Sequence, residues 1–362
     1  LKQDIITRGN TVLNFEKKIS KLLKSKYSVS FNSASSGLTA ACFALDLKKN
    51  DLVWTVPNTF EASASCALHF SAKIDFVDID KFYKNISIDE LEKKLSISKK
   101  KNKLPKLLIT VHFGGQAPNQ NRIFNLSRKY GFKIIEDASH SFGGSRKNEP
   151  IGSCKWADMT ISSFHPVKTI TTGEGGVACT NSKLLFERLK IYRNNGIVRD
   201  YKYLKNKSLD KFYYEQQFLG HNFHMSDINA ALGISQISKI KIFIKKREQI
   251  FKYYNKHLNE NNLLLPRIEK ENRSTHHLYI VNLKNEINRE KIFKHMYKKG
   301  INLNVHYIPV HLHPYYFKKG FRMGNFPVSE WHYKTAISLP IYYDLSFKQI
   351  DIIIKEINKV SK

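Results

Sequence analysis

The chain of 362 residues is 41% hydrophobic and 12% aromatic, a composition typical of a folded protein with a substantial core. It contains 60 Lys and Arg residues but only 31 Asp and Glu residues, which gives a formal net charge of +29. Mean hydropathy is -0.41 and no apolar run is long enough for a membrane-spanning helix, so we expect no membrane partner.

The positive charge admits a nucleic-acid partner, but the lysines are spread along the chain without a helix-turn-helix, an RNP aromatic motif or zinc spacing. Solvated helix faces explain the charge better, and we expect no nucleic-acid partner. A basic surface would still gather an anionic substrate. The four cysteines form no CxxC pair, which argues against a metal site or a disulfide framework and fits a reducing cytoplasm.

From about residue 28, short β-branched or aromatic runs alternate with helix-period segments. Strands are expected at 28–31, 51–57, 73–80, 106–113 and 132–137, and helices near 36–47, 60–71, 87–95 and 119–131. This order predicts an α/β fold with a mostly parallel central sheet and helices on both faces. Ligands of such sheets gather at the carboxyl ends of the strands.

After a glycine-rich reversal that returns the chain as a strand near 177–180, longer helices are expected at 182–194, 225–237 and 238–256, the last a basic connector. The stretch 196–220 is the least periodic and is expected to be a long loop. The remainder predicts a small α+β unit. We therefore expect a large α/β domain over residues 1–237, and a connector helix with a small C-terminal domain over residues 238–362.

Asp137 stands at the end of the apolar strand 132–137 and would project into the ligand crevice, although a helix-capping or turn acid is an ordinary role for it too. His140, three residues later, could be a common partly buried histidine. Ser35 and Ser36 stand with Ser33 before a helix, where hydroxyls and free N–H groups can seat a phosphate or simply cap the helix. Phe60, after another strand, could stack on a planar ligand or belong to the core.

Lys168 lies in "SSFHPVKTITTGEGGVACT", a few residues after an apolar strand and before three glycines that permit a reversal. No Walker spacing accompanies the glycines. The requirements of pyridoxal 5'-phosphate match the groups expected at this one edge of the sheet: a lysine, a carboxylate, an aromatic ring and a helix N-terminus with hydroxyl groups. This cofactor requires an amine, an acid against its ring nitrogen and an anchor for its phosphate.

Four stretches, "SSFHPVKTITTGEGGVACT", "EDASHSFGGSRKNEPIGS", "GHNFHMSDINAALGISQI" and "NVHYIPVHLHPYY", resemble the DegT/DnrJ/EryC1/StrS family of sugar-nucleotide aminotransferases over practically the whole chain. The resemblance implies the type I fold of pyridoxal-phosphate enzymes and a homodimer with shared active sites. It is strongest toward the pseudaminic-acid branch, whose members transfer an amino group, usually from L-glutamate, to carbon 4 of a UDP-linked 4-keto-6-deoxy sugar.

The same resemblance implies roles for individual residues. Lys168 would be the Schiff-base lysine, Asp137 the partner of the pyridinium nitrogen, and His140 a neighbour of the ring oxygen. Catalysis is assigned to these three.

The remaining cofactor and substrate contacts also follow from the resemblance. Phe60 would stack on the ring, and Ser35, Ser36 and Ser163 would bind the phosphate, together with Asn222 from the neighbouring subunit. The substrate-binding residues would be His306, Tyr307 and His224, the last at a position where the family usually has an arginine.

Two readings stay open beside a 4-keto-sugar aminotransferase. An aminotransferase for another nucleotide-linked keto sugar, including the 3-keto regiochemistry, is compatible with the motifs, whereas Lys168 counts against a 3-dehydratase because that branch has histidine there. A non-catalytic basic binding protein on a degenerate enzyme fold is the alternative from another class. The sequence does not fix the sugar or its stereochemistry.

Overall fold

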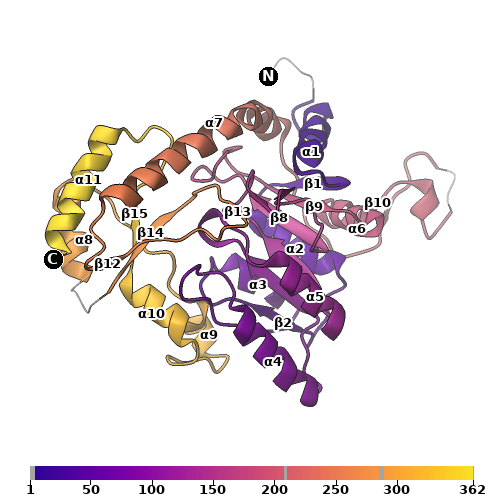
Figure 1. Ribbon diagram of the computed structural model, residues 1–362. Coiled ribbons are helices and arrows are strands. Elements are labelled where there is room, and N and C mark those ends of the chain that lie inside the picture. Colours follow the sequence, from indigo (N-terminus) through magenta and orange to yellow (C-terminus); the bar gives the residue numbers. More distant parts are fainter. Residues whose placement is uncertain (1–4, 208–209, 285–288, 362) are drawn as a thin grey trace.

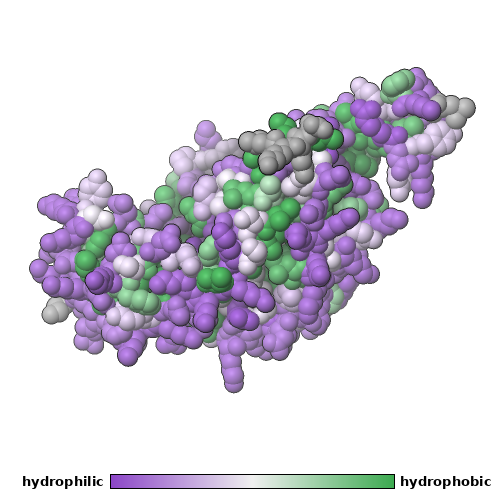
Figure 2. All heavy atoms as spheres, turned by 90° about the horizontal axis from the view of Figure 1, so that it is seen from above, coloured by the Kyte–Doolittle hydropathy of each residue, from purple (hydrophilic) through white to green (hydrophobic). Residues whose placement is uncertain are grey.

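The computed structural model describes residues 5–207, 210–284 and 289–361. Figure 1 shows a central sheet with helices on both sides and a separate group of helices and strands at the C-terminal end. Helix α7 (Asp227–His257) runs from the side of α1 (Asn10–Leu23) to that group. Hydrophilic side chains cover most of the face seen from above in Figure 2. Among the described residues, no helix is both long and apolar enough to cross a lipid bilayer.

The central sheet has seven strands in the order β1-β9-β8-β5-β4-β2-β3. They are β1 (Tyr27–Phe31), β2 (Leu52–Thr55), β3 (Lys73–Phe76), β4 (Leu107–Val111), β5 (Lys133–Asp137), β8 (Met159–Ser163) and β9 (Gly176–Thr180). Neighbouring strands are parallel except where β9 pairs with β1 and with β8. The expected mostly parallel sheet is therefore confirmed.

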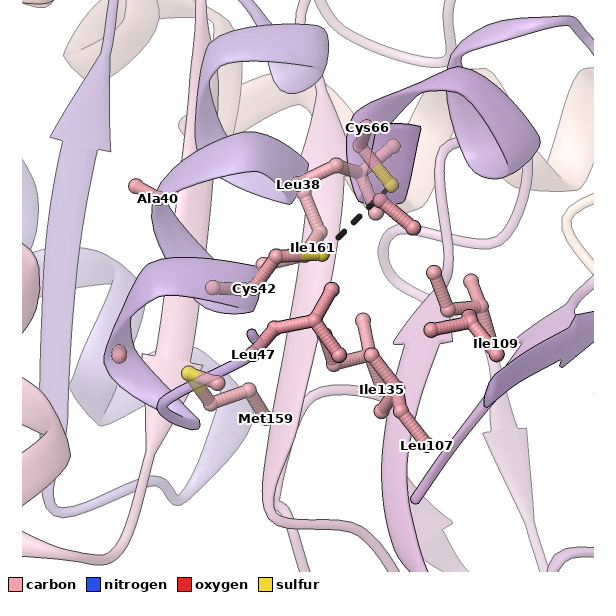
Figure 3. Packing of buried hydrophobic residues seen from close by; sticks show 14 of the residues in the cluster. Leu38, Ala40, Cys42, Leu47, Cys66, Leu107, Ile109, Ile135, Met159 and Ile161 are labelled. Atoms are coloured by element: carbon pink, nitrogen blue, oxygen red, sulfur yellow. Dashed lines mark hydrogen bonds between the residues drawn. The ribbon is translucent and has the colours of Figure 1, made fainter. Parts of the chain in front are cut away.

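Side chains alternate between the two faces of the sheet, as the pleat requires. Leu107 and Ile109 pack with Leu38 in a cluster that Figure 3 shows from close by. Leu108, which lies between them in the sequence, packs instead with Leu91 on the opposite face. Both faces of β4 are thus buried, which explains why this strand is a continuous apolar run.

The helices around the sheet are α1 (Asn10–Leu23), α2 (Ala34–Ala44), α3 (Ala62–Leu68), α4 (Ile88–Lys100), α5 (Gln120–Tyr130) and α6 (Lys183–Arg193). Polar residues mark several of their starts: the side chains of Ser33, Ser87 and Asn119 each accept a hydrogen bond from a backbone N–H in the first turn. Gly131 ends α5 with φ of 81°, a conformation that glycine adopts without steric cost, as its position in the sequence predicted.

Helix α7 (Asp227–His257) is one continuous helix of 31 residues, so the expectation of two helices at 225–237 and 238–256 was wrong. No helix-breaking residue lies at the junction of residues 237 and 238. The Ser238 hydroxyl donates to the carbonyl of Ser235, a hydrogen bond that helical backbone can accommodate. Gly233 allows close packing, since a Cβ there would lie 2.5 Å from Cε2 of Phe15 in α1. The expected domain boundary between residues 237 and 238 falls inside this helix.

The C-terminal group contains a three-stranded antiparallel sheet, β12-β14-β15. Its elements are β12 (Leu263–Leu264), β14 (Tyr279–Leu283), β15 (Ala336–Leu339), α8 (Arg289–Lys298) and α11 (Phe347–Val360). Tyr254 of α7 packs into the core of this group, with its ring 4.6 Å from that of Tyr279. Below, this group is called the small lobe.

Short elements complete the chain: β6 (Ser145–Arg146), β7 (Glu149–Pro150), β10 (Ile197–Val198), β11 (Glu215–Gln216), β13 (Asn272–Arg273), α9 (Pro314–Phe317), α10 (Pro327–Thr335) and the 3-10 turns 113–115, 201–203 and 310–312. The stretch expected to be a long loop, 196–220, contains the two-stranded sheet β10-β11. Residues 208–209 of that stretch lie outside the described residues.

Candidate active site

A cavity of about 370 Å³ lies where β5 and β8 end, at the carboxyl edge of the central sheet. Segments at the start of α2, before α3, after β5 and after β8 line it, together with His277, His306 and Tyr307, which come after α7 in the sequence. The position agrees with the rule that ligands of α/β sheets bind at strand carboxyl ends. Among the described residues, no group of side chains is arranged to hold a metal ion.

Lys168 lines this cavity from the loop between β8 and β9. Its backbone N–H donates to the carbonyl of His165, which fixes the turn that carries it. Burial lowers the pKa of the Lys168 amine to about 8, although the nearby Asp137 carboxylate favours the charged form. A lysine with such a pKa can both accept and donate a proton near neutral pH.

Asp137 is the last residue of β5 and lines the same cavity. Its Oδ1 accepts hydrogen bonds from the backbone N–H of Ser139 at 3.1 Å and from the Ser139 hydroxyl at 2.5 Å. Its Oδ2 accepts one from the hydroxyl of Ser63 at 2.6 Å, and that hydroxyl is 2.8 Å from the hydroxyl of Thr59. Both carboxylate oxygens are therefore held in place by donors from two separate segments.

His140 is buried at the cavity wall. Burial, with the nearby Lys168 and His306, holds its pKa well below the usual range, so the imidazole is neutral at pH 7. Its Nε2 lies 3.0 Å from the hydroxyl of Tyr307, while its Nδ1 has no hydrogen-bond partner in the described part of the chain. The ring of His277 lies 4.4 Å from that of His140.

The N-terminus of α2 forms one end of the cavity, where Ser33 and Ser35 line it. Unpaired N–H groups of a helical first turn, together with hydroxyls, are suited to an anion such as a phosphate. Ser163, the last residue of β8, lies on the same cavity. The hydroxyl of Ser36, which was expected here, instead donates to Oδ1 of Asn32 at 2.6 Å, and Ser36 does not line the cavity.

Phe60 lies at the cavity wall, with 56% of its surface exposed. Its ring makes an edge contact with that of Tyr307 at 6.5 Å. An aromatic ring at the wall of a cavity can stack on a planar ligand.

The expected substrate residues divide into two groups. His306 and Tyr307 line the cavity, and burial lowers the pKa of His306 to about 4. His224 does not line it: its Nε2 lies 3.1 Å from Oδ1 of Asn194, and burial lowers its pKa to about 4. Asn222, also outside this cavity, is exposed and forms an isolated bridge with Asn194.

The residues present fit pyridoxal phosphate. A lysine amine and a carboxylate line one cavity, a buried histidine nitrogen lacks a partner, and a helix N-terminus with hydroxyls can take the phosphate. Sequence reasoning missed Ser63, Ser139 and His277. Ser139 could have been found from its position two residues after Asp137, where a short polar side chain commonly bonds the preceding carboxylate.

A model of the DegT/DnrJ/EryC1/StrS aminotransferase family matches residues 1–358. The chain is 38% identical over 365 residues to the uncharacterized protein MJ1066 of Methanocaldococcus jannaschii, covering 99% of this chain and 92% of that protein. It is 34% identical over 371 residues to UDP-4-amino-4,6-dideoxy-N-acetyl-beta-L-altrosamine transaminase of Campylobacter jejuni, covering 100% of this chain and 94% of that protein. The solved structure of Helicobacter pylori PseC, an aminotransferase involved in the biosynthesis of pseudoaminic acid, matches with a TM-score of 0.89 at 27% identity, covering 99% of this chain and 93% of that one.

Proposed function

Since this chain belongs to the DegT/DnrJ/EryC1/StrS aminotransferase family, we propose that it transfers an amino group from L-glutamate to carbon 4 of a UDP-linked 4-keto-6-deoxy-N-acetylhexosamine. The chain is a sugar aminotransferase with the type I fold of pyridoxal-phosphate enzymes. The product would be a UDP-linked 4-amino sugar for pseudaminic acid or a related surface glycan. The named C. jejuni relative, 34% identical over the full chain, supports this choice of sugar.

The observation that supports the catalytic assignment most directly is that Lys168 and Asp137 line one cavity and interact electrostatically within it. When bound there, pyridoxal phosphate supplies a carbonyl that accepts the amino group and a ring that withdraws electrons from the reacting carbon. Lys168 would hold it through its amine, Asp137 would face the ring nitrogen, and His140 would lie by the ring oxygen. Phe60 would cover the ring, and Ser35 and Ser163 would bind the phosphate.

In the first half of a ping-pong reaction, Nζ of Lys168 takes the proton from the α-carbon of glutamate. In the second half it delivers a proton to carbon 4 of the sugar. Its pKa of about 8 suits both steps, since the amine gains and loses a proton at little cost near neutral pH. Asp137 remains an acceptor for the ring nitrogen because donors on both of its oxygens hold its orientation. His140 and Tyr307, whose ring nitrogen and hydroxyl lie 3.0 Å apart, would help to exclude water from the cavity wall.

A homodimer with shared sites belongs to the same proposal. Asn222 is exposed and lies outside the cavity of its own chain, and we place it in the cavity of a second copy. Exposed apolar side chains at Ile5, Ile6 and Leu13 supply surface for such a contact, and Figure 2 shows hydrophobic side chains gathered in the middle of the face seen from above. Residues 1–237 and 238–362 would form the large and small domains, with α7 shared between them.

The compartment that suits this reaction is the cytoplasm. All four cysteines are free and buried, as expected for a protein of a reducing compartment.

The test is an assay of the purified protein, loaded with pyridoxal phosphate, against a panel of UDP-linked 4-keto-6-deoxy-N-acetylhexosamines with L-glutamate. We expect a yellow protein whose absorbance band shifts on addition of glutamate, and a product whose NMR spectrum places the amine on carbon 4. A 3-amino product, or turnover only with another nucleotide sugar, would overturn the substrate assignment while leaving the enzyme class intact. A colourless protein that instead binds DNA with steep salt dependence would overturn the enzymatic proposal altogether.

A further inference from the structure

A second cavity, of about 330 Å³, lies between the large part of the chain and the small lobe. The loop 81–84 after β3 and the turn 113–116 after β4 line one side, and segments between 251 and 282 line the other. No residue lines both this cavity and the active-site cavity. Phe113 separates them: it lines the second cavity, and its ring lies 6.3 Å from the rings of His140 and Tyr307, which line the first. The volume is at the lower end of the range of about 300–1,000 Å³ that is typical of small-molecule sites.

Aromatic rings and amides form much of the wall. Phe82, Tyr83 and Phe251 contribute rings, and Gln116 and Asn255 contribute amide groups. The Gln116 amide is already fixed, since it donates to the carbonyl of Arg267 at 2.9 Å and accepts from the backbone N–H of Glu269 at 3.1 Å. Rings with a few fixed polar groups are the usual lining of a pocket for a planar ligand.

Three cationic residues, Lys81, Lys84 and Arg267, line the cavity. The guanidinium of Arg267 lies 5.4 Å over the ring of Phe82, which also lines it. The ammonium groups of Lys81 and Lys84 lie 5.0 and 4.8 Å from the centre of the indole of Trp331, which is not among the lining residues. None of the three cations forms an ion pair with a carboxylate in the described part of the chain. The Lys84 ammonium donates to the carbonyl of Lys81, which leaves two of its three donors for another partner.

The acids nearby do not balance this charge. Asp80 attracts Lys84, but its Oδ1 already accepts the backbone N–H groups of Phe82 and Tyr83, both at 2.7 Å. Glu260 is the one carboxylate among the residues that line the cavity. Burial and the repulsion of Lys81 lower the pKa of Lys84 to about 8, which is the expected response of a partly buried lysine that lacks a full counter-charge.

We propose that this cavity binds an anion that carries a planar ring, of the size and chemistry of a nucleoside monophosphate. The ring would pack against Phe82 and Phe251, and the anionic group would meet Lys81, Lys84 and Arg267. Such a ligand relieves the repulsion between the cations and uses apolar surface that water hydrates poorly. It would also bridge the large part of the chain and the small lobe, since both contribute to the walls.

The test is calorimetric titration of the cofactor-loaded protein with UMP and with AMP, beside uridine and inorganic phosphate. We expect a dissociation constant below about 1 mM for at least one nucleotide. Uridine, which lacks the charge, and phosphate, which lacks the ring, should each bind at least about tenfold more weakly. Absence of nucleotide binding, or phosphate binding as tightly as the nucleotide, would overturn the proposal.

Two variants test whether the measured nucleotide binding takes place in this cavity. Lys84→Met keeps the length of the side chain, and Arg267→Gln changes an exposed residue. Each should weaken nucleotide binding about ten- to hundredfold. Lys129→Met is the matched control, because its ammonium also lies over an aromatic ring, that of Tyr130, but does not line the cavity. Unchanged affinity in both variants would place the nucleotide elsewhere, including the active-site cavity, and would overturn the proposal whatever the outcome of the sugar assay.

Discussion

The hydroxyl of Ser63 donates a 2.6 Å hydrogen bond to Oδ2 of Asp137, which lies 74 residues further along the chain. Ser63 is fully buried, and its oxygen is 2.8 Å from the hydroxyl of Thr59. Because an ionised carboxylate only accepts, Ser63 must donate to Asp137, and its oxygen is then free to accept from Thr59. The segment that carries Phe60 to the cavity therefore also sets the orientation of the Asp137 carboxylate.

Replacement of Ser63 by alanine should loosen that carboxylate. The loss of a hydrogen bond to a charged group costs about 1.5–3 kcal/mol, so we expect kcat to fall about tenfold or more. If Asp137 faces the ring nitrogen as proposed, the pH at which the bound cofactor changes its visible absorbance should also differ between the variant and the unchanged protein. A purely structural serine would alter thermal stability without moving that pH.

Ser65→Ala is the matched control on the same helix, since Ser65 is only partly buried and does not contact Asp137. Equal spectra for both alanine variants would argue against a positioning role for Ser63.

Replacement of Lys168 by alanine should abolish the transfer of the amino group. The residue is proposed both to hold the cofactor and to move the proton, and positioned acid–base groups alone contribute about 10²–10⁴-fold. Stopped-flow absorbance would measure the half-reaction with glutamate. We expect the variant still to bind the cofactor without a covalent bond, and added methylamine to restore part of the rate. Undiminished turnover would contradict the assignment.

The stability of the cofactor-free protein should depend on pH through Lys168. Its folded-state pKa of about 8 lies below the ordinary value of 10.5, so between these values the unfolded chain binds more protons than the folded one. Stability from this group therefore rises with pH across this window: the penalty is fully present below about pH 8 and absent above about pH 10.5. The full difference is at most about 3 kcal/mol.

Thermal melts of the cofactor-free protein and of Lys168→Met at pH 7 and pH 10 would measure this effect. The difference in stability between the two proteins at each pH removes the contribution of the other lysines. Relative to the unchanged protein, Lys168→Met should be stabilised more at pH 7 than at pH 10. A difference that does not change with pH would show that the amine is not buried as described.

Much of the fold was predictable because its signals are local. Strand-length apolar runs alternate with helix-period segments, and the parallel order follows from that alternation. Helix α7 was divided in two because the basic composition begins near residue 238, yet composition does not end a helix unless a breaker or a cap accompanies it. The continuous packing of Gly233 against Phe15 is a tertiary contact that no local pattern reveals.

The site was predictable only in part, for a similar reason. Asp137 ends one strand, and His140 and Lys168 come after strands whose carboxyl ends meet at the same edge, so their convergence could be expected from the order of elements. Ser63 lies on a helix between strands, and His277 precedes a strand of the small lobe, so neither carries a signal without the three-dimensional arrangement. Ser36 was a plausible phosphate contact, but it is turned toward Asn32 by its place in the helix.

The proposed dimer can be tested through Asn222, which lies outside the cavity of its own chain. Asn222→Asp keeps the shape of the side chain and places a negative charge where the proposal puts a phosphate, so this variant should bind the cofactor poorly and turn over slowly. Lys168→Ala should be inactive for an independent reason. In a dimer with shared sites, a mixed pair of these two chains has one cavity with both defects and one cavity with neither.

Mixing the two inactive variants under conditions that exchange subunits should therefore restore activity. With equal amounts and random exchange, half of the dimers are mixed and half of their sites are intact, so about a quarter of the activity of the unchanged protein should return. Two variants that share a defect, such as Lys168→Ala mixed with Lys168→Met, are the control and should stay inactive. If Asn222 acted within its own chain, every cavity in the mixture would carry at least one defect, and no activity would return, whatever the oligomeric state.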